Sequence, residues 1–240
     1  WTYTWQNGRQ LQKMQKSGVT AEFVYNADGL RVQKTVNGVA TKYTLHGKNV
    51  VHMTSGTDEL HFFYDAQNRP AVVVYNGVPY AYVKSLQGDV IAILDAVGNV
   101  VVSYAYDAWG APIGKSGALA ETLGTVQPFR YRGYVYDEET GMYYLQIRFY
   151  SPVLSRFLTN DGEQTLCIDY ECITDRNLKN YCGNNPVNRK DEGGDFWALI
   201  GAAVGAIISA GFELADQLIS GTKIEDVDWK DVGIAAASGA

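Results

Sequence analysis

A turn motif that occurs four times constrains the fold of this chain more than any other feature. In each copy an aromatic residue precedes Asp or Asn, and Gly or Asn follows after two or three residues; the copies are Tyr25–Gly29, Tyr64–Asn68, Tyr106–Gly110 and Tyr136–Gly141. The Asp or Asn side chain can accept backbone N–H groups just ahead, and Gly or Asn tolerates a positive φ. The motif therefore predicts tight turns in a repeat architecture, whose units bury a face only against their neighbours.

The segments between these turns have the composition of strands. They are rich in β-branched and aromatic residues, and the 240-residue chain contains 17 Tyr, an aromatic content that favours strands over helices. Asn37-Gly38 and Asn76-Gly77 are hairpin turns between apolar runs. Residues 1–160 are predicted to form successive antiparallel hairpins, so that the fold class is mainly β with one spiralling sheet.

Charge and motif content exclude several functions. The net charge of −6 argues against a protein that binds duplex nucleic acid, or a membrane surface, through a basic face. The sequence has no Gly-Lys-Ser/Thr loop, no dinucleotide fingerprint and no His-Glu-x-x-His motif. We expect neither a cofactor nor a free-standing enzyme. His46, His52 and His61 are expected to be surface or pore-lining residues.

The three cysteines, Cys167, Cys172 and Cys182, lie close together in the sequence. An odd number cannot form a complete disulfide framework, and zinc would need a fourth ligand that the neighbouring sequence does not offer. We therefore expect no metal at these residues. Packed or loop thiols, with at most one disulfide, are the favoured interpretation.

Longer motifs carry a resemblance to a known family. The chain contains Tyr106-Asp-Ala-Trp-Gly-Ala-Pro112, an Arg- and Tyr-rich stretch over 128–150, Arg156-Phe-Leu158, and Asn177-Leu-Lys-Asn-Tyr-Cys-Gly-Asn-Asn-Pro-Val-Asn188. These segments resemble the Rhs repeat-associated core, and residues 1–105 resemble the YD repeats that precede it. The resemblance divides the chain into YD repeats (1–105), the core (106–195) and a C-terminal segment (196–240).

The resemblance implies a function for the whole. Members of this family build a hollow, cocoon-like β-shell that encloses a C-terminal polymorphic toxin, and the core closes one end. We expect Trp1 and Ala240 to be the ends of a fragment of a longer chain. The expected partners are the rest of that chain and the toxin domain. An immunity protein and secretion machinery are further expected partners. The family also implies a bacterial protein that is secreted or attached to the cell surface.

In several family members two aspartates of the core cut the chain just before the toxin. By position the resemblance carries these roles to Asp161 and Asp191, with Asp175 as a rival acid and a cut between Gly194 and Trp197. Two adjacent carboxylates can share a proton, so that one activates water while the other protonates the leaving group. Neither aspartate is followed by the Pro of the family pattern. The alternative is that both hold turns through side-chain bonds to the backbone.

Four arginines, Arg130, Arg132, Arg148 and Arg156, lie among aromatic residues. Stacking on rings and pairing with core carboxylates is the role that we expect for them. A second interpretation for Arg148 and Arg156 is that they support the cut by polarising the scissile carbonyl.

The C-terminal segment begins with an uncharged run over 196–212, rich in Ala and Gly. It is slightly shorter than the ~20 residues of a membrane-spanning helix. A short α-helical segment is predicted here, either lodged inside the shell ahead of the toxin or inserted into a target membrane.

A different class of function fits the same repeats. Some YD-repeat proteins are thought to be cell-surface adhesins, and aromatic strand faces can bind carbohydrate. The orientation of the rings separates the two hypotheses: an outward-facing row of Tyr and Trp favours adhesion, and rings that face a lumen favour encapsulation.

Overall fold

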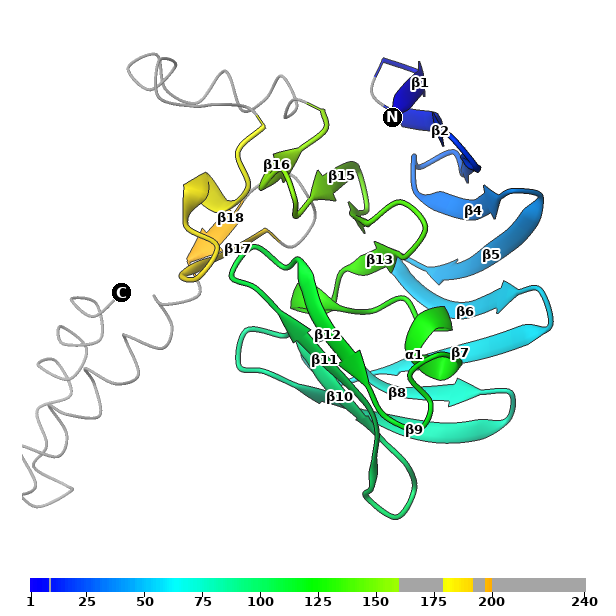
Figure 1. Cartoon of the computed structure of the whole chain (residues 1–240), viewed down its shortest axis with the longest axis vertical. Coiled ribbons are helices and arrows are strands. Elements are labelled where there is room, and N and C mark those ends of the chain that lie inside the picture. The colour runs from blue at the N-terminus through cyan, green and yellow to red at the C-terminus, as the bar shows by residue number, and fades with distance from the viewer. Residues whose placement is uncertain (9, 160–178, 192–196, 200–240) are drawn as a thin grey trace, which may run out of the picture.

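A computed structural model describes residues 1–8, 10–159, 179–191 and 197–199. Twelve strands form one antiparallel sheet in which each strand pairs with its neighbours in sequence (Figure 1). They are β1 (Thr2–Gln6), β2 (Gln10–Lys16), β3 (Val19–Tyr25), β4 (Arg31–Val36), β5 (Val39–His46), β6 (Asn49–Ser55), β7 (Asp58–Tyr64), β8 (Pro70–Tyr75), β9 (Val78–Lys84), β10 (Val90–Leu94), β11 (Val100–Tyr106) and β12 (Pro112–Ser116). The predicted succession of antiparallel hairpins is confirmed.

The repeated motif builds its turns as predicted in three of its four copies. A side-chain oxygen accepts backbone N–H groups two and four residues ahead, at 2.8–3.1 Å, and the oxygen belongs to Asn26, Asp65 or Asp107. The Gly or Asn that ends each of these copies has a positive φ, which is the conformation that such turns require.

The aromatic residue of the motif holds each hairpin together. The hydroxyl groups of Tyr25, Tyr64 and Tyr106 donate to backbone carbonyls of the preceding strand, at 2.7–2.8 Å. In all three cases the tyrosine is the last residue of its strand, and the register of the strand pairing shifts just before it. Burial raises the pKa of each of these hydroxyl groups, so they remain protonated donors at neutral pH.

The fourth copy departs from the prediction. The side chain of Asp137 does not cap its own turn; its backbone carbonyl accepts the N–H groups of Thr140 and Gly141 instead. The carboxylate is fully buried and forms ion pairs with Arg31 at 2.5 Å and Lys34 at 3.2 Å, both on β4. A buried carboxylate needs such partners, and two cations of the large sheet supply them.

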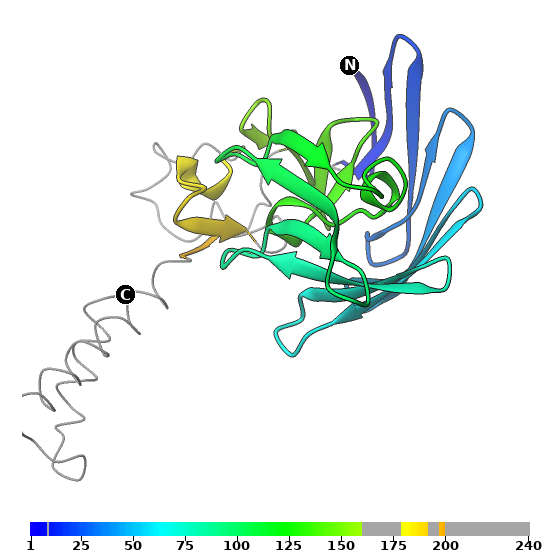
Figure 2. The ribbon, with the colours of Figure 1, turned by 60° about the horizontal axis from the view of Figure 1, so that its bottom comes forward.

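A second layer covers the inner face of the large sheet. The strands β13 (Val135–Asp137), β14 (Met142–Leu145), β15 (Arg148–Ser151) and β16 (Arg156–Phe157) form a small antiparallel sheet. The helix α1 (Leu123–Val126) and a 3₁₀ turn at Tyr131–Gly133 precede it. Figure 2 shows the twelve strands curving around these segments.

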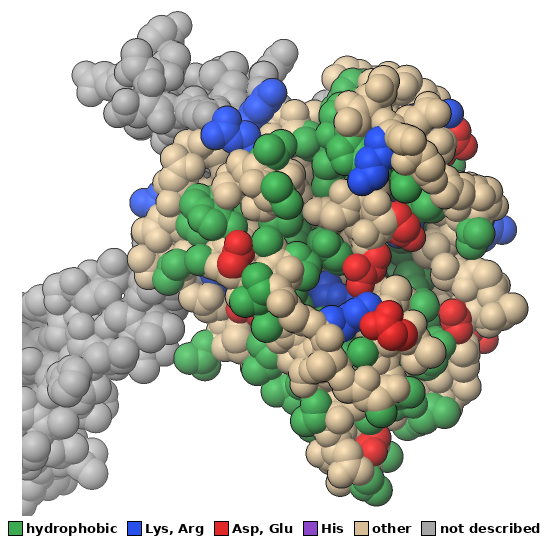
Figure 3. Space-filling model, in the orientation of Figure 1, with side chains coloured by type: hydrophobic (Ala, Val, Ile, Leu, Met, Phe, Trp, Pro, Cys, Tyr) green, Lys and Arg blue, Asp and Glu red, His purple; other side chains and the backbone are tan. Residues whose placement is uncertain are grey.

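Apolar side chains fix this arrangement. Phe129 and Leu123 pack into a cluster with inward-facing residues of β5–β11, such as Phe62. Further along, Met142 and Phe149 pack against the inner face of β2 and β3. The face shown in Figure 3 carries mixed charges, with acidic and basic side chains among apolar ones.

The described part of the C-terminal region adds one short hairpin, β17 (Arg189–Asp191) paired with β18 (Trp197–Leu199). The prediction of a helix is therefore wrong for the first residues of the apolar run, because they pair with β17. The remainder of 196–212 lies outside the described residues. Among the helices that the structure describes, none is long and apolar enough to cross a membrane.

Gly117, which follows β12, offers a test of how closely the chain packs against the neighbouring strand β11. Its φ is +116°, and a Cβ at this position would overlap the carbonyl oxygen of Val101. Gly117→Ala is expected to lower the free energy of unfolding by about 2–5 kcal/mol, since overlap with backbone adds to left-handed strain. The matched control is Gly98→Ala: Gly98 also has a positive φ, but an added Cβ meets no atom within 4 Å, so strain alone acts and about 1–2 kcal/mol is expected. Equal losses in chemical denaturation would show that the overlap is relieved.

Candidate functional site

Asp191 is the one predicted acid that lies within the described residues. It is the last residue of β17 and is 2% exposed. Its register partner across the small hairpin is Trp197 of β18. The predicted cut between Gly194 and Trp197 therefore falls in the connection that begins at Asp191. Asp161 and Asp175 lie outside the described residues, and so does Gly194.

Arg148 pairs with this buried acid. Its guanidinium lies 3.4 Å from Oδ2 of Asp191, and both side chains are 3% exposed. The same guanidinium lies over the ring of Phe157, 3.7 Å from its centroid. A tight turn at Gln146, where φ is positive, returns the chain so that Arg148 stands opposite Leu145. Stacking on a ring and pairing with a carboxylate were both predicted for this arginine, and both are present.

Arg156 is placed differently. Its side chain is exposed, and its backbone pairs with Ser151 and forms a bridge with Asn180. The structure thus brings Arg148 to Asp191, whereas Arg156 lies at the surface of β16. Arg130 and Arg132 are buried and stack on Tyr104 and Tyr131, as predicted.

Two tyrosines complete the surroundings of Asp191. The hydroxyl of Tyr134 donates to the backbone carbonyl of Asp191 and lies 3.2 Å from the hydroxyl of Tyr181. Burial raises the pKa of both tyrosines well above the ordinary value, so both hydroxyl groups stay protonated. Sequence analysis missed them because nothing in an aromatic-rich segment distinguishes rings that face an acid from rings that fill the core.

Cys182 lies beside this cluster as a free, buried thiol. Burial raises its pKa to about 12, so it is a poor nucleophile and a poor metal ligand at neutral pH. This agrees with the predicted packed thiol. Cys167 and Cys172 lie outside the described residues.

Chemically, the site holds a carboxylate beside a guanidinium in an apolar, tyrosine-lined environment. An opposite charge at this distance favours the ionised carboxylate. An ionised carboxylate can accept a proton from water, whereas a second carboxyl group would have to supply the acid. The assignment of Asp161, Asp191, Asp175, Arg148 and Arg156 to catalysis stays a prediction.

A pocket lies between the two layers on the inner face of the large sheet. Its volume is about 380 Å³, and its lining includes the basic side chains of Arg31, Lys48, Arg69, Arg132 and Lys190. Gly133 and Tyr134, which precede β13, also line it. The interior of the curved sheet is thus filled in part by the second layer and left open in part.

Several known proteins have sequences similar to this chain. tRNA(Glu)-specific nuclease WapA of Bacillus subtilis subsp. natto is 37% identical over 247 residues, an alignment that covers 99% of this chain and 10% of the relative. Salivary gland surface protein 1 of Aedes aegypti is 35% identical over 118 residues, or 47% of this chain and 3% of the relative. The chain thus spans about a tenth of the length of WapA.

Solved structures share the fold. The crystal structure of TcdB2-TccC3-Cdc42 matches with a TM-score of 0.64 and 22% identity, and the Photorhabdus luminescens Tc holotoxin pore matches with a TM-score of 0.60 and 20% identity. Each match covers 80% of this chain and 10% of the other. The model of the teneurin YD-shell family matches residues 49–187, more than half of the sequence. Together with the twelve-stranded sheet and its Tyr-Asp turns, this match shows that the chain belongs to the teneurin YD-shell family of Rhs and YD-repeat shell proteins.

Proposed function

We propose that this chain is a segment of an Rhs-type toxin, and that it forms part of a hollow shell around a toxin domain that follows it. The large sheet would be the wall, and the layer of β13–β16 would help to close it. The relatives support this proposal. WapA, a tRNA nuclease by its name, aligns with 99% of this chain over only 10% of its own length. A secreted or cell-surface location, an immunity protein and secretion machinery belong to the same proposal.

The orientation of the aromatic rings carries the proposal. Every tyrosine within the described ranges is buried or half-buried, and Tyr43, Tyr82 and Tyr104 lie in the core on the inner face of the sheet. The large exposed aromatic side chains in the same ranges are Trp1, Trp5 and Phe63. Because the tyrosines in the described ranges point inward and these three rings are the large aromatic side chains that are exposed there, the arrangement favours a shell over an adhesive outer face.

The edges of the sheet support the same proposal. Among the described strands, β1 pairs with β2 and β12 pairs with β11, so each leaves one edge without a strand partner. An exposed edge of a twelve-stranded sheet is a site for further pairing. In the proposed shell, the hairpins that precede this segment would continue the wall from β1.

Protection from protease tests the enclosure. In the longer protein, the toxin domain is expected to resist proteinase K under native conditions and to become sensitive when a denaturant opens the wall. Digestion is followed by intact mass, and the isolated toxin domain is the control for intrinsic resistance. Equal digestion rates for the enclosed and isolated domains would contradict the proposal.

We further propose that the chain cuts itself after the core, with Asp191 as the ionised carboxylate. Asp191 would take a proton from water as the water oxygen attacks the scissile carbonyl, and a protonated Asp161 would give its proton to the leaving amine. The C–N bond breaks, one water is consumed, and a new carboxyl and a new amino terminus form. The burial of Asp191, its pairing with Arg148 and its position at the start of the connection to Trp197 support this proposal.

A further inference from the structure

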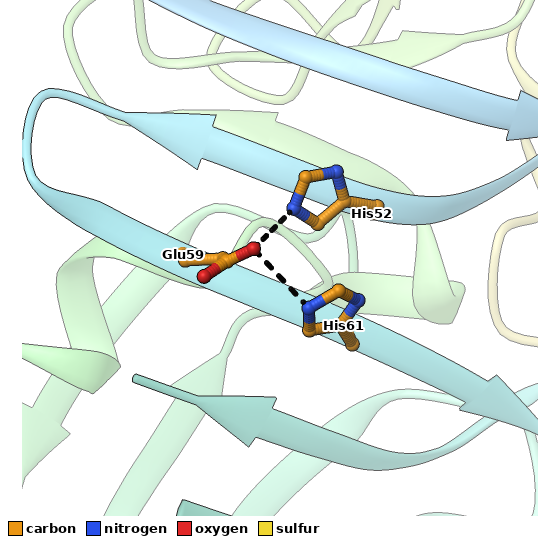
Figure 4. Close-up of side chains that lie close together, drawn as sticks. All are labelled: His52, Glu59 and His61. Atoms are coloured by element: carbon orange, nitrogen blue, oxygen red, sulfur yellow. Dashed lines mark hydrogen bonds and ion pairs between the residues drawn. The ribbon is translucent and has the colours of Figure 1, made fainter. Parts of the chain in front are cut away.

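Three side chains with metal-ligating groups converge on the outer face of the large sheet. His52 of β6 is the direct register partner of His61 of β7, and Glu59 lies two residues before His61. Residues two apart on a strand share a face. Leu60, between Glu59 and His61, and Met53, next to His52, point into the core instead. Figure 4 shows one carboxylate oxygen of Glu59 joined to both imidazole rings.

The distances match those within a metal coordination sphere. Glu59 Oε1 lies 3.1 Å from His52 Nε2 and 3.4 Å from His61 Nε2. One ligand atom from each residue can be chosen so that all three lie within 4.8 Å of one another. Two ligands of a tetrahedral zinc ion, each at about 2.0–2.1 Å, lie about 3.3 Å apart. Two of the three spacings therefore agree with a tetrahedral edge before any side chain moves.

We propose that His52, Glu59 and His61 bind a divalent transition metal ion of the zinc class. Two imidazoles and one carboxylate are ligands that such ions prefer, whereas calcium and magnesium prefer all-oxygen sites. This proposal is independent of the proposed shell function, because the three residues face away from the interior of the sheet.

The hairpin prepares the site in advance. β6 and β7 are joined by backbone pairing from His52–His61, within the cluster, to Ser55–Asp58 beside the turn, so no loop must be ordered when the metal binds. The rings are stacked, with centroids 4.5 Å apart and planes 23° apart, and both Nε2 atoms approach the same carboxylate oxygen. The side chains are 28%, 57% and 48% exposed for His52, Glu59 and His61, which leaves an entry path.

The fourth coordination position would be open. The outward side chains beside the cluster, in register with its members, are Thr44, Thr54 and Val74, and none of them is a preferred ligand of zinc. In the part of the chain that the structure describes, the three-residue group is complete as it stands. Water, or a donor group from another molecule, would therefore occupy the remaining position.

Calorimetric titration of the full chain with zinc chloride, in a buffer without chelator or phosphate, tests the proposal. We expect one ion per chain, no binding of calcium, and a visible absorption band of tetrahedral type when cobalt replaces zinc. His61→Gln and Glu59→Gln should each weaken zinc binding by at least about tenfold. Removing a residue that only orients a metal ligand already weakens metal binding by about that factor, and removing the ligand itself should weaken it at least as much.

The chain supplies its own matched control in the third histidine. His46 is exposed on β5 and does not belong to the cluster, so His46→Gln should bind zinc as the wild type does. All of these side chains are partly or fully exposed, and far-UV circular dichroism checks that each variant is folded. Absence of stoichiometric zinc binding by the wild type, or equal affinity of His61→Gln and His46→Gln, would overturn the proposal. Neither result would affect the protease-protection test of the shell.

Discussion

Asp137→Asn is expected to lower the free energy of unfolding by about 3–5 kcal/mol, measured by urea denaturation. The carboxylate is fully buried between Arg31 and Lys34, and the guanidinium of Arg31 also lies over the ring of Tyr144, 4.4 Å from its centroid. Removing the negative charge leaves the buried guanidinium of Arg31 facing a neutral amide, whereas Lys34 keeps its ion pair with Glu139 at 2.7 Å. Asp137 ends β13 of the second layer, whereas Arg31 and Lys34 lie on β4 of the large sheet. The variant therefore weakens the contact between the two layers.

Asp107→Asn is the matched control for this variant. Asp107 occupies the same position of the repeated motif, but its side chain is exposed and accepts backbone N–H groups. Asn retains the accepting oxygen, so a change within about 0.5 kcal/mol is expected. If the two variants lost equally little stability, the buried ion pairs would not be what holds the second layer to the wall.

Because of the Asp137 carboxylate, we expect the free energy of unfolding to depend on pH. Burial by itself raises the pKa of Asp137, but Arg31 and Lys34 hold it below the ordinary value of 3.8. A carboxyl group whose pKa is lowered in the folded state contributes stability above its unfolded pKa, and this contribution is lost as the pH falls through the folded value. The wild type should therefore lose more stability than Asp137→Asn as the pH falls below about 4.

Asp191→Asn is expected to abolish the proposed cut, with a rate at least about 10³-fold lower than that of the wild type. Asn keeps the shape of the side chain but cannot accept the proton of the attacking water. Intact mass of the full-length protein should show two products from the wild type, separated between Gly194 and Trp197, and a single uncut species from Asp191→Asn. Asp161→Asn should behave like Asp191→Asn.

Asp175→Asn is the control for the rival acid and should leave the cut unchanged. A thermal melt of each variant shows whether the fold is retained, since Asp191 is also paired with Arg148. Persistent cutting in a folded Asp191→Asn variant would contradict the proposal. It would leave Asp191 with a structural role through its ion pair with Arg148, rather than the turn-holding bonds to the backbone that were the alternative expected from the sequence.

Local features of the fold could be predicted from the sequence. Turns at Asn26, Asp65 and Asp107 follow from side chains that bond to the backbone within four residues, so no distant part of the chain had to be known. The strands followed from composition and from the spacing of the turns. The resemblance to Rhs and YD-repeat proteins extended this to the family, which the family model then confirmed.

Contacts between distant segments could not be predicted in the same way. Arg31 and Asp137 are 106 residues apart in the sequence, and the pattern of a turn motif gave no reason to remove Asp137 from its turn. The stacking of His52 on His61 depends on register, which a one-residue shift would undo. The pairing of Arg148 with Asp191 needed the placement of two separate hairpins. In each case a local pattern identified the residue type, and long-range packing determined its partner.

The proposed shell requires a closed chamber that holds a toxin domain on the inner side of the twelve-stranded sheet, next to the second layer. A cryo-electron microscopy map of the longer protein tests it most directly. We expect hairpins that continue the sheet beyond β1, a closed wall, and density for the toxin domain on the inner side of the sheet, toward which Tyr43, Tyr82 and Tyr104 point. A map in which the sheet stays open and the toxin domain lies on its outer face, beside His52 and His61, would contradict it.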